Sequence, residues 1–157
     1  MNASSRPFAS VTCMTFRVLI VCKGNICRSP MAEVIVRTRL AREGMEVTSA
    51  GLAAMRGHPI DPRAQAELAA HGYDGSSHVA RQATKALMND AHLLLAMEQR
   101  QLSAALALCP TLRGRVFMLS HWNDGEDIDD PYGREQDAFG AAFNRIESCI
   151  RDWRTKL

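Results

Sequence analysis

Cys22 and Arg28 are separated by five residues, and this spacing could place a thiol nucleophile and a phosphate-binding guanidinium in one loop. A tight loop whose backbone N–H groups turn inward makes an anion cradle, and a helix that begins at its end adds roughly half a positive charge. Gly24 permits backbone geometry that a side chain would block, and Asn25 tolerates a left-handed conformation. The guanidinium of Arg28 can hold two phosphoryl oxygens at once. The segment therefore predicts a loop that binds a phosphate dianion.

The same loop predicts covalent chemistry at Cys22. A cysteine at a helix N-terminus and beside cations is held as the thiolate, which is the nucleophilic form. A thiolate that displaces an alkoxide or a phenoxide needs a proton donor for the leaving group. The turn Asp129-Asp130-Pro131-Tyr132-Gly133 offers a carboxylic acid, with an aromatic ring beside it. Cys22 and Arg28, together with a carboxyl group of this turn, are therefore the predicted catalytic groups.

Alternating strands and helices are expected to position this loop. Short apolar runs predict strands buried on both faces, and apolar residues at helical spacing predict the helices between them. The predicted strands are 16–21, 46–50, 91–96 and 115–119, and the predicted helices lie between 30 and 44, at 61–72, 84–89 and 98–108, and along 139–153. This order predicts an α/β fold, a three-layer domain with a four-stranded parallel sheet flanked by helices on both faces. Ligands of such sheets bind beyond the carboxyl ends of the strands, where Cys22 lies.

Length and composition limit the class of the protein. The 157 residues fit one domain, and 46% hydrophobic with 23% charged residues is an ordinary globular mixture. Residues 1–15 are polar and lack periodicity, so they predict a flexible N-terminal extension before a single domain at 16–157. Nineteen basic and 17 acidic residues give a net charge of +2, which predicts no nucleic-acid partner. No apolar run approaches the roughly 18 residues of a membrane span.

The cysteines indicate a reducing compartment rather than a disulfide framework. Their number is five, which is odd, and the N-terminal sequence lacks the features of an export signal. These features predict free thiols and a cytoplasmic location. Neither the cysteines nor the histidines have the spacing of metal ligands, so no metal or other cofactor is expected. Cys109 and Cys149 are interpreted as small buried hydrophobic residues.

Several separated motifs resemble, in the same order, the low-molecular-weight protein tyrosine phosphatases. They are Val-Cys-Lys-Gly-Asn-Ile-Cys-Arg-Ser-Pro at 21–30, Ser-Ala-Gly at 49–51, Asp-Pro-Arg-Ala at 61–64, Ser-His-Val-Ala-Arg-Gln at 77–82 and Asp-Pro-Tyr at 130–132. The stretch 121–132 is most similar to the bacterial branch associated with capsule and exopolysaccharide synthesis. The resemblance implies metal-free hydrolysis of phosphotyrosine through a cysteinyl-phosphate intermediate. It also implies tyrosine-phosphorylated proteins as substrates, in particular a bacterial tyrosine autokinase.

The resemblance also assigns roles to individual residues. It implies that Cys22 is the nucleophile, Arg28 the phosphate-binding arginine and Asp130 the general acid. The hydroxyl of Ser29 would donate to the Cys22 sulfur, and the ring of Tyr132 would flank the substrate ring. The implied substrate-binding residues are Lys23, Gly24, Asn25, Ile26, Cys27, Ser29 and Tyr132.

Three further residues have implied supporting roles. Ser49 and His78 would position Asn25 and so hold the loop in shape. Cys27 matches a second loop cysteine that in the family can pair with the nucleophile on oxidation. The residues alone leave open whether Cys27 has this role or only fills space in the loop.

Two residues depart from the family pattern. Gly133 stands where many members have a second aromatic residue, which predicts a more open mouth to the substrate pocket. Lys23 stands next to the nucleophile, where relatives are often uncharged. This cation predicts a preference for acidic sequence around the phosphotyrosine.

Two other functions share some of these features. An arsenate-reductase-like thiol oxidoreductase would have the same loop and fold, but it should carry two further cysteines close together, and Cys109 and Cys149 are far apart in the sequence. A phosphotyrosine-binding module without turnover would be expected to lack Cys22, Arg28 or Asp130. Because all three are present, the sequence favours the phosphatase.

Overall fold

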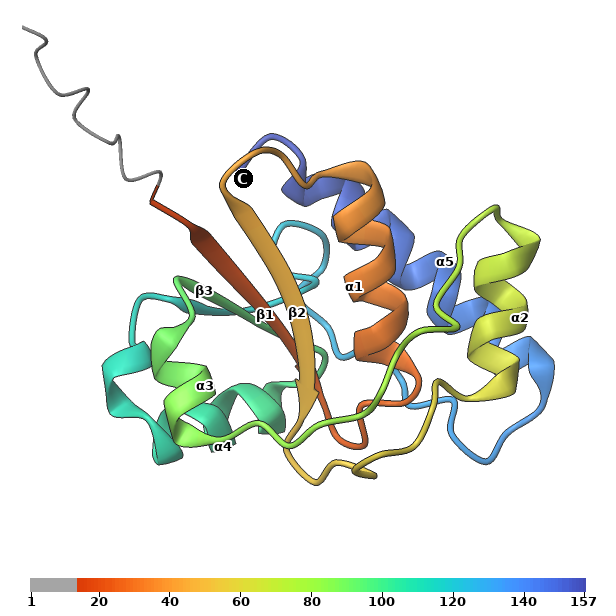
Figure 1. The fold of residues 1–157 in the computed structure, drawn as a ribbon, viewed down its shortest axis with the longest axis horizontal. Helices are drawn as coiled ribbons and strands as arrows, with labels where there is room; N and C mark the ends of the chain where they lie inside the picture. The colour runs from red at the N-terminus through yellow and green to blue at the C-terminus, as the bar shows by residue number, and fades with distance from the viewer. Residues whose placement is uncertain (1–13) are drawn as a thin grey trace, which may run out of the picture.

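A parallel sheet in the strand order β2-β1-β3-β4 forms the centre of the protein (Figure 1), in a computed structural model that describes residues 14–157. The strands are β1 (Phe16–Cys22), β2 (Met45–Gly51), β3 (Leu93–Ala96) and β4 (Val116–Met118). All four predicted strands are confirmed, although β3 begins two residues later than predicted and β4 is shorter at both ends. The predicted N-terminal extension lies, except for residues 14 and 15, outside the described residues.

The helices also follow the predicted order. They are α1 (Arg28–Arg39), α2 (Pro62–Ala70), α3 (Lys85–Asp90), α4 (Gln99–Leu108) and α5 (Gln136–Trp153), and a single 3₁₀ turn at Pro110–Leu112 was not predicted. The predicted N-cap of α2 is confirmed, because the Asp61 side chain accepts a hydrogen bond from the Arg63 N–H. Helix α1 begins two residues before Pro30. The proline is tolerated there because the N–H groups of the first turn have no partner within the helix.

The helices form a layer on each face of the sheet. Figure 1 shows α1, α2 and α5 on one side of the strands and α3 and α4 on the other. Successive residues of β1 point to opposite layers, so Val18 and Ile20 pack toward α1 and α5 while Leu19 and Val21 pack toward α3 and α4. The predicted three-layer α/β architecture is therefore confirmed.

The apolar stripe of α5 is buried as predicted. Its residues Phe139, Phe143, Ile146, Ile150 and Trp153 are all at most 4% exposed. The stripe closes one core layer against α1, as its 3.6-residue periodicity requires. Among residues 14–157, no helix is both long and apolar enough to cross a bilayer.

The carboxyl ends of the strands meet at one edge of the sheet. Cys22 ends β1, Gly51 is its partner at the end of β2, and Ala96 ends β3 on the other side. Every loop that follows one of these strands therefore starts within reach of Cys22. This edge is where the parallel topology places a ligand.

Candidate active site

The loop from Cys22 to Arg28 is held in shape by the side chain of Asn25. Asn25 is the single non-glycine residue with positive φ, at 59°, among the described residues, which confirms the predicted left-handed conformation. Its Oδ1 accepts from the Arg81 backbone N–H at 2.9 Å, and its Nδ2 donates to the hydroxyls of Ser29 and Ser49 at 2.8 and 2.9 Å. These three bonds cross-link the loop to α1, to β2 and to the segment before α3.

The same bonds fix the direction of the hydrogen bond between Ser29 and Cys22. A backbone N–H can only donate, so the Arg81 N–H identifies the oxygen of the Asn25 amide and leaves its nitrogen as the donor to Ser29 Oγ. The Ser29 hydroxyl hydrogen is then free to point at Cys22 Sγ, 2.9 Å away. The Asn25 backbone N–H donates to the same sulfur at 3.3 Å. Two donors therefore converge on Cys22, and donors to sulfur stabilise its anionic form.

His78 supports the loop from the opposite side. Its Nε2 lies 2.6 Å from the Asn25 carbonyl oxygen, and because that oxygen can only accept, Nε2 is the donor. Its Nδ1 lies 4.0 Å from a carboxylate oxygen of Glu33 on α1. The structure thus brings Asn25, Ser49 and His78 together as the sequence predicted.

At this edge of the sheet, the glycine that has no room for a side chain is Gly51 and not Gly24. A Cβ on Gly24 would have its nearest neighbours at 3.7 Å or more, and its φ is not positive, so the prediction that a side chain is blocked there is wrong. A Cβ on Gly51 would lie 2.5 Å from the Lys23 carbonyl oxygen. The glycine that the fold requires is therefore the last residue of β2, because the catalytic loop passes directly over it.

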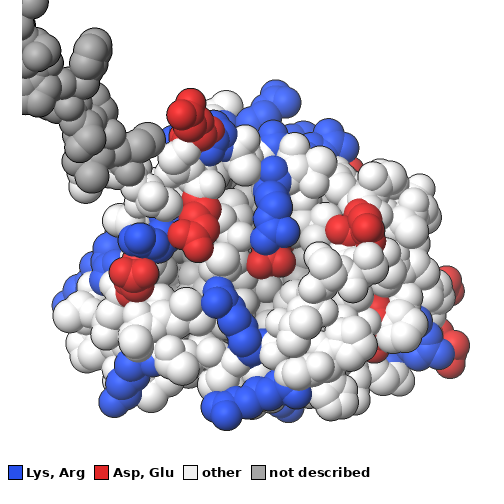
Figure 2. Space-filling model, in the orientation of Figure 1, with Lys and Arg blue, Asp and Glu red and all other residues white. Residues whose placement is uncertain are grey.

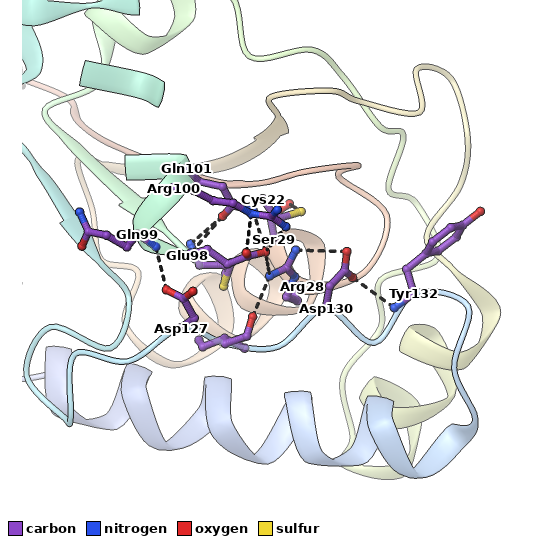
Figure 3. A network of polar contacts seen from close by, with 12 residues as sticks. Cys22, Arg28, Ser29, Glu98, Gln99, Arg100, Gln101, Asp127, Asp130 and Tyr132 are labelled. Carbon is purple, nitrogen blue, oxygen red and sulfur yellow. Dashed lines mark hydrogen bonds and ion pairs between the residues drawn. The ribbon is translucent and has the colours of Figure 1, made fainter. Parts of the chain in front are cut away.

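Arg28 is the largest charged side chain enclosed by the fold, at 1% exposure. Its Nη1 donates to Glu98 Oε1 at 2.6 Å and to the Ile128 carbonyl at 2.7 Å (Figure 3). Its Nη2 lies 3.4 Å from Asp130 Oδ2, and its Nε has no partner within the described residues. The guanidinium is thus anchored at one nitrogen, and Nε and Nη2 remain for an anionic ligand.

Glu98 is a functional residue that the sequence reasoning missed. It is 8% exposed, precedes α4 and accepts from Arg28 and from Gln101 Nε2, while Arg100 pairs with its second oxygen at 2.7 Å. Burial alone would raise the pKa of Glu98, but the hydrogen bonds from Arg28 and Arg100 outweigh it and hold the pKa below its usual value. A charged residue two positions after the apolar strand β3, which pairs with β1, was the available signal.

Asp130 reaches the site on a loop that the core holds in place. Ile128 is 1% exposed, and its N–H donates to the Met97 carbonyl at 2.9 Å while its own carbonyl accepts from Arg28. Asp127 Oδ1 accepts from the Gln99 N–H at 2.8 Å. The Asp130 carboxylate follows, about one-third exposed, with its Oδ1 accepting from the Tyr132 N–H at 3.1 Å. The Asp130 side chain is therefore presented to the pocket from a fixed turn.

These residues surround one pocket, with about 480 Å³ of empty space that is partly open to solvent. Its lining comprises Cys22, Lys23, Gly24, Ile26, Cys27, Arg28, Ala53, Met55, Asp130 and Tyr132. Tyr132 is 54% exposed and stands at the rim, followed by Gly133 with φ of 77°, a conformation that favours glycine. The apolar wall at Ala53 and Met55 was not predicted, because only the fold brings the loop after β2 over Cys22.

The remaining thiols have separate environments. Cys27 lines the pocket beside Cys22, and both are free. Burial raises the pKa of the Cys27 thiol, and the carboxylates of Asp61 and Asp130 raise it further. Cys109 and Cys149 are buried as predicted, and burial raises the pKa of Cys149 to about 11. Within residues 14–157, no three His, Cys, Asp or Glu side chains are grouped so that they could hold a metal ion.

Replacing Glu98 with glutamine should lower kcat/KM for an aryl phosphate about tenfold. The charge-assisted bond that anchors Arg28 would become a neutral one, a loss of about 1.4 kcal/mol in orienting the guanidinium. The measurement is steady-state kinetics together with the dissociation constant of inorganic phosphate, which should rise. Asp124→Asn is the matched control, since Asp124 pairs with Arg145 and neither residue lines the pocket. Unchanged kinetics and phosphate affinity in Glu98→Gln would show that Glu98 does not position Arg28.

Comparison with known proteins places this geometry among phosphatases. Residues 17–157 match the family model described as low molecular weight phosphotyrosine protein phosphatase. The chain is 37% identical over 141 residues to the low molecular weight protein-tyrosine-phosphatase Wzb of Salmonella typhimurium, covering 90% of this chain and 93% of that protein.

Two solved structures are similar over nearly the whole chain. The tyrosine phosphatase AmsI of Erwinia amylovora superimposes with a TM-score of 0.86 at 35% identity, covering 92% of this chain and 94% of that one. A mutant of the arginine phosphatase YwlE, in which serine replaces a cysteine and the active-site serine is phosphorylated, gives a TM-score of 0.83 at 30% identity, with coverage of 90% and 95%.

Proposed function

The chain belongs to the low molecular weight phosphotyrosine protein phosphatase family, and we propose that it hydrolyses phosphotyrosine through a phosphocysteine at Cys22. The observation that carries the proposal is the convergence of Cys22, Arg28 and Asp130 on one pocket, with the Ser29 hydroxyl 2.9 Å from the sulfur. The phosphorylated active-site serine in the similar YwlE mutant supports a covalent intermediate at this position.

Binding uses the positive character of the loop. We expect the phosphoryl oxygens to accept from backbone N–H groups of the loop between Lys23 and Arg28 and from Nε and Nη2 of Arg28. An anionic sulfur must approach an anionic phosphoryl group, so fixed donors are needed to stabilise the charge on the equatorial oxygens.

The reaction then takes place in two displacements. In the first, the S–P bond forms at Cys22 as the bond from phosphorus to the tyrosine oxygen breaks, and Asp130 gives its proton to that oxygen. In the second, a water oxygen attacks phosphorus while the Asp130 carboxylate takes the water's proton. The S–P bond breaks, and the Ser29 hydroxyl stabilises the departing thiolate. The products are tyrosine and inorganic phosphate, and Cys22 and Asp130 return to their starting states.

Replacing Asp130 with alanine should slow poor leaving groups far more than good ones. For aryl phosphates whose phenols are weak acids, we expect kcat to fall about 10²- to 10⁴-fold, because the oxygen must leave unprotonated. For the most acidic phenols the fall should stay within about tenfold. The measurement is kcat across a series of aryl phosphates. Asp129→Ala is the control, since this exposed neighbour does not line the pocket. Equal slowing of all members would remove Asp130 from the role of acid.

Assays of four substrates test the function against its alternatives. We expect p-nitrophenyl phosphate and a phosphotyrosine peptide to be hydrolysed at rates that a metal chelator does not change. Arsenate reduction with a thiol donor and hydrolysis of phosphoarginine are the competing activities. Cys109 and Cys149 lie in opposite core layers, so within residues 14–157 they cannot relay a disulfide from the pocket. Faster turnover of arsenate or phosphoarginine than of phosphotyrosine would overturn the proposal.

For the cellular substrate, we propose the phosphotyrosines of a bacterial tyrosine autokinase, dephosphorylated in the cytoplasm. The support is the resemblance of residues 121–132 to the branch associated with capsule and exopolysaccharide synthesis. A pull-down from the native cell with Cys22→Ser as the trap tests it. Recovery of a tyrosine-phosphorylated kinase is the expected result, and recovery of only unrelated phosphoproteins would contradict the assignment.

A further inference from the structure

A second pocket adjoins the catalytic one and is not used by the reaction above. It is lined by Lys23, Leu52, Arg100, Gln101 and Ala104. Lys23 lines both pockets, so they share a wall. A peptide residue advances the chain by roughly 3.3–3.6 Å, and a residue one or two positions from the phosphotyrosine therefore reaches the second pocket.

The two cations of the second pocket, Lys23 and Arg100, have N–H groups available to bind a ligand. Lys23 is exposed, and within residues 14–157 it forms no ion pair. The Arg100 side chain is 71% exposed and binds Glu98 through Nε at 2.7 Å and Nη2 at 3.4 Å, which leaves Nη1 without a partner in the described part of the chain. Glu98 is also shared with Arg28, so one carboxylate serves two guanidiniums.

The cations of the second pocket lie on one side of the catalytic pocket. Figure 2 shows Lys and Arg side chains along the lower edge of the molecule, on the left and in the centre, with no Asp or Glu between them on this face. In Figure 3, Arg100 and Tyr132 lie on either side of Arg28. Tyr132 follows Asp130 on its loop, while Asp127 of the same loop accepts from the Gln99 N–H on the Arg100 side. A peptide bound across Cys22 therefore meets Lys23 and Arg100 on one side only.

The floor of the second pocket suits a short aliphatic stem. Leu52 and Ala104 supply apolar surface between the two cations. A glutamate side chain has two methylenes below a carboxylate, and it can pack the methylenes on this floor while its carboxylate meets the cations. The phosphate of the phosphotyrosine is bound by the loop at Cys22. The anion that a neighbouring residue of the peptide can bring to the second pocket is therefore a carboxylate.

We propose that Lys23, Arg100, Leu52 and Ala104 form a subsite for an acidic residue, glutamate above all, within two positions of the phosphotyrosine and on one side of it only. The subsite rests on the proposed function, because it selects among phosphotyrosine peptides. With this subsite, the preferred substrates are phosphotyrosine sequences that carry an acidic residue beside the phosphotyrosine. A carboxylate on the Tyr132 side meets neither Lys23 nor Arg100, so it gains nothing there.

The test compares phosphotyrosine peptides that differ in one residue. Glutamate or its neutral isostere glutamine is placed at each of the two positions before and the two after the phosphotyrosine in an otherwise uncharged peptide. We expect the kcat/KM ratio of glutamate over glutamine to reach about three- to tenfold on one side, from one or two partly exposed ion pairs, and to be near or below one on the other. The ratio should fall as salt is raised, because salt screens exposed charges.

Variants show which side chains produce the ratio. Lys23→Ala and Arg100→Ala should each lower it toward one, and because the ratio is taken within one enzyme, any general loss of activity cancels. Arg56→Ala is the matched control. Arg56 is an exposed cation of the loop after β2 and does not itself line either pocket, so this variant should keep the full ratio.

Three outcomes would overturn the subsite. A ratio of one at every position, with the glutamine peptides hydrolysed, refutes the subsite and leaves the proposed function intact. A ratio that survives both Lys23→Ala and Arg100→Ala also refutes it. Failure to hydrolyse any phosphotyrosine peptide refutes the proposed function and the subsite together.

Discussion

Replacing Cys22 with serine should lower kcat/KM for a phosphotyrosine peptide by a factor of about 10⁴ or more. The two donors that converge on the sulfur, from Ser29 at 2.9 Å and the Asn25 N–H at 3.3 Å, stabilise a thiolate. A serine hydroxyl stays neutral under the same conditions, and its oxygen is a poorer leaving group in the second displacement. The cradle itself is unchanged, so inorganic phosphate should bind with an affinity close to that of the wild type.

Stopped assays and a phosphate titration on the same preparation measure both quantities. Cys109→Ala is the matched control, because it removes a buried thiol from the opposite core layer. This control should lose some stability and keep its kcat/KM within about twofold. If Cys22→Ser retained more than a hundredth of wild-type turnover, Cys22 would not be the nucleophile.

Replacing Arg28 with lysine should lower kcat/KM by about 10³-fold or more, although the positive charge is kept. An ammonium cannot hold Glu98 and the Ile128 carbonyl while presenting two further N–H groups to a phosphoryl group, as the planar guanidinium does. The dissociation constant for inorganic phosphate should rise together with the loss of turnover. Because Glu98 loses part of its hydrogen bonding, the free energy of unfolding should also fall, by about 1–3 kcal/mol.

Arg115→Lys provides the control for this prediction. Arg115 also grips backbone carbonyls, those of Ala91 and Thr111, but it lies before β4 at the opposite end of the sheet. Its replacement should affect stability and leave the kinetics unchanged. An Arg28→Lys enzyme with kcat/KM within tenfold of wild type and unchanged phosphate affinity would contradict the account of Arg28.

Local sequence was sufficient to predict the framework and the catalytic loop. The apolar run before Cys22 determines where β1 ends, and the alternation of strands and helices places that end at the ligand-binding edge of a parallel sheet. The left-handed backbone at Asn25 was predictable, because few residue types accept it. The contacts of Ser29, Ser49 and His78 with Asn25 and Cys22 followed from the family resemblance.

What sequence could not reveal depends on contacts between distant segments. Glu98 binds Arg28, which lies 70 positions earlier in the sequence. In the sequence, Glu98 followed by Arg100 and Gln101 at the start of α4 resembles an ordinary helix cap. Gly51 is required because the carbonyl of Lys23 passes over it, which no local pattern encodes. The wrong prediction at Gly24 has the same cause. From sequence alone, a glycine in a loop does not show whether a side chain would clash with its neighbours or whether the backbone angle requires glycine.

Trapping the covalent intermediate tests the central claim most directly. The enzyme is mixed with a phosphotyrosine peptide, quenched with acid within milliseconds, digested and mapped by mass spectrometry. The account predicts a peptide that carries one phosphoryl group on Cys22, formed in the wild type and absent from Cys22→Ala. A phosphoryl group on another residue, or turnover with no phosphorylated enzyme in wild type and in Asp130→Ala at any quench time, would contradict it.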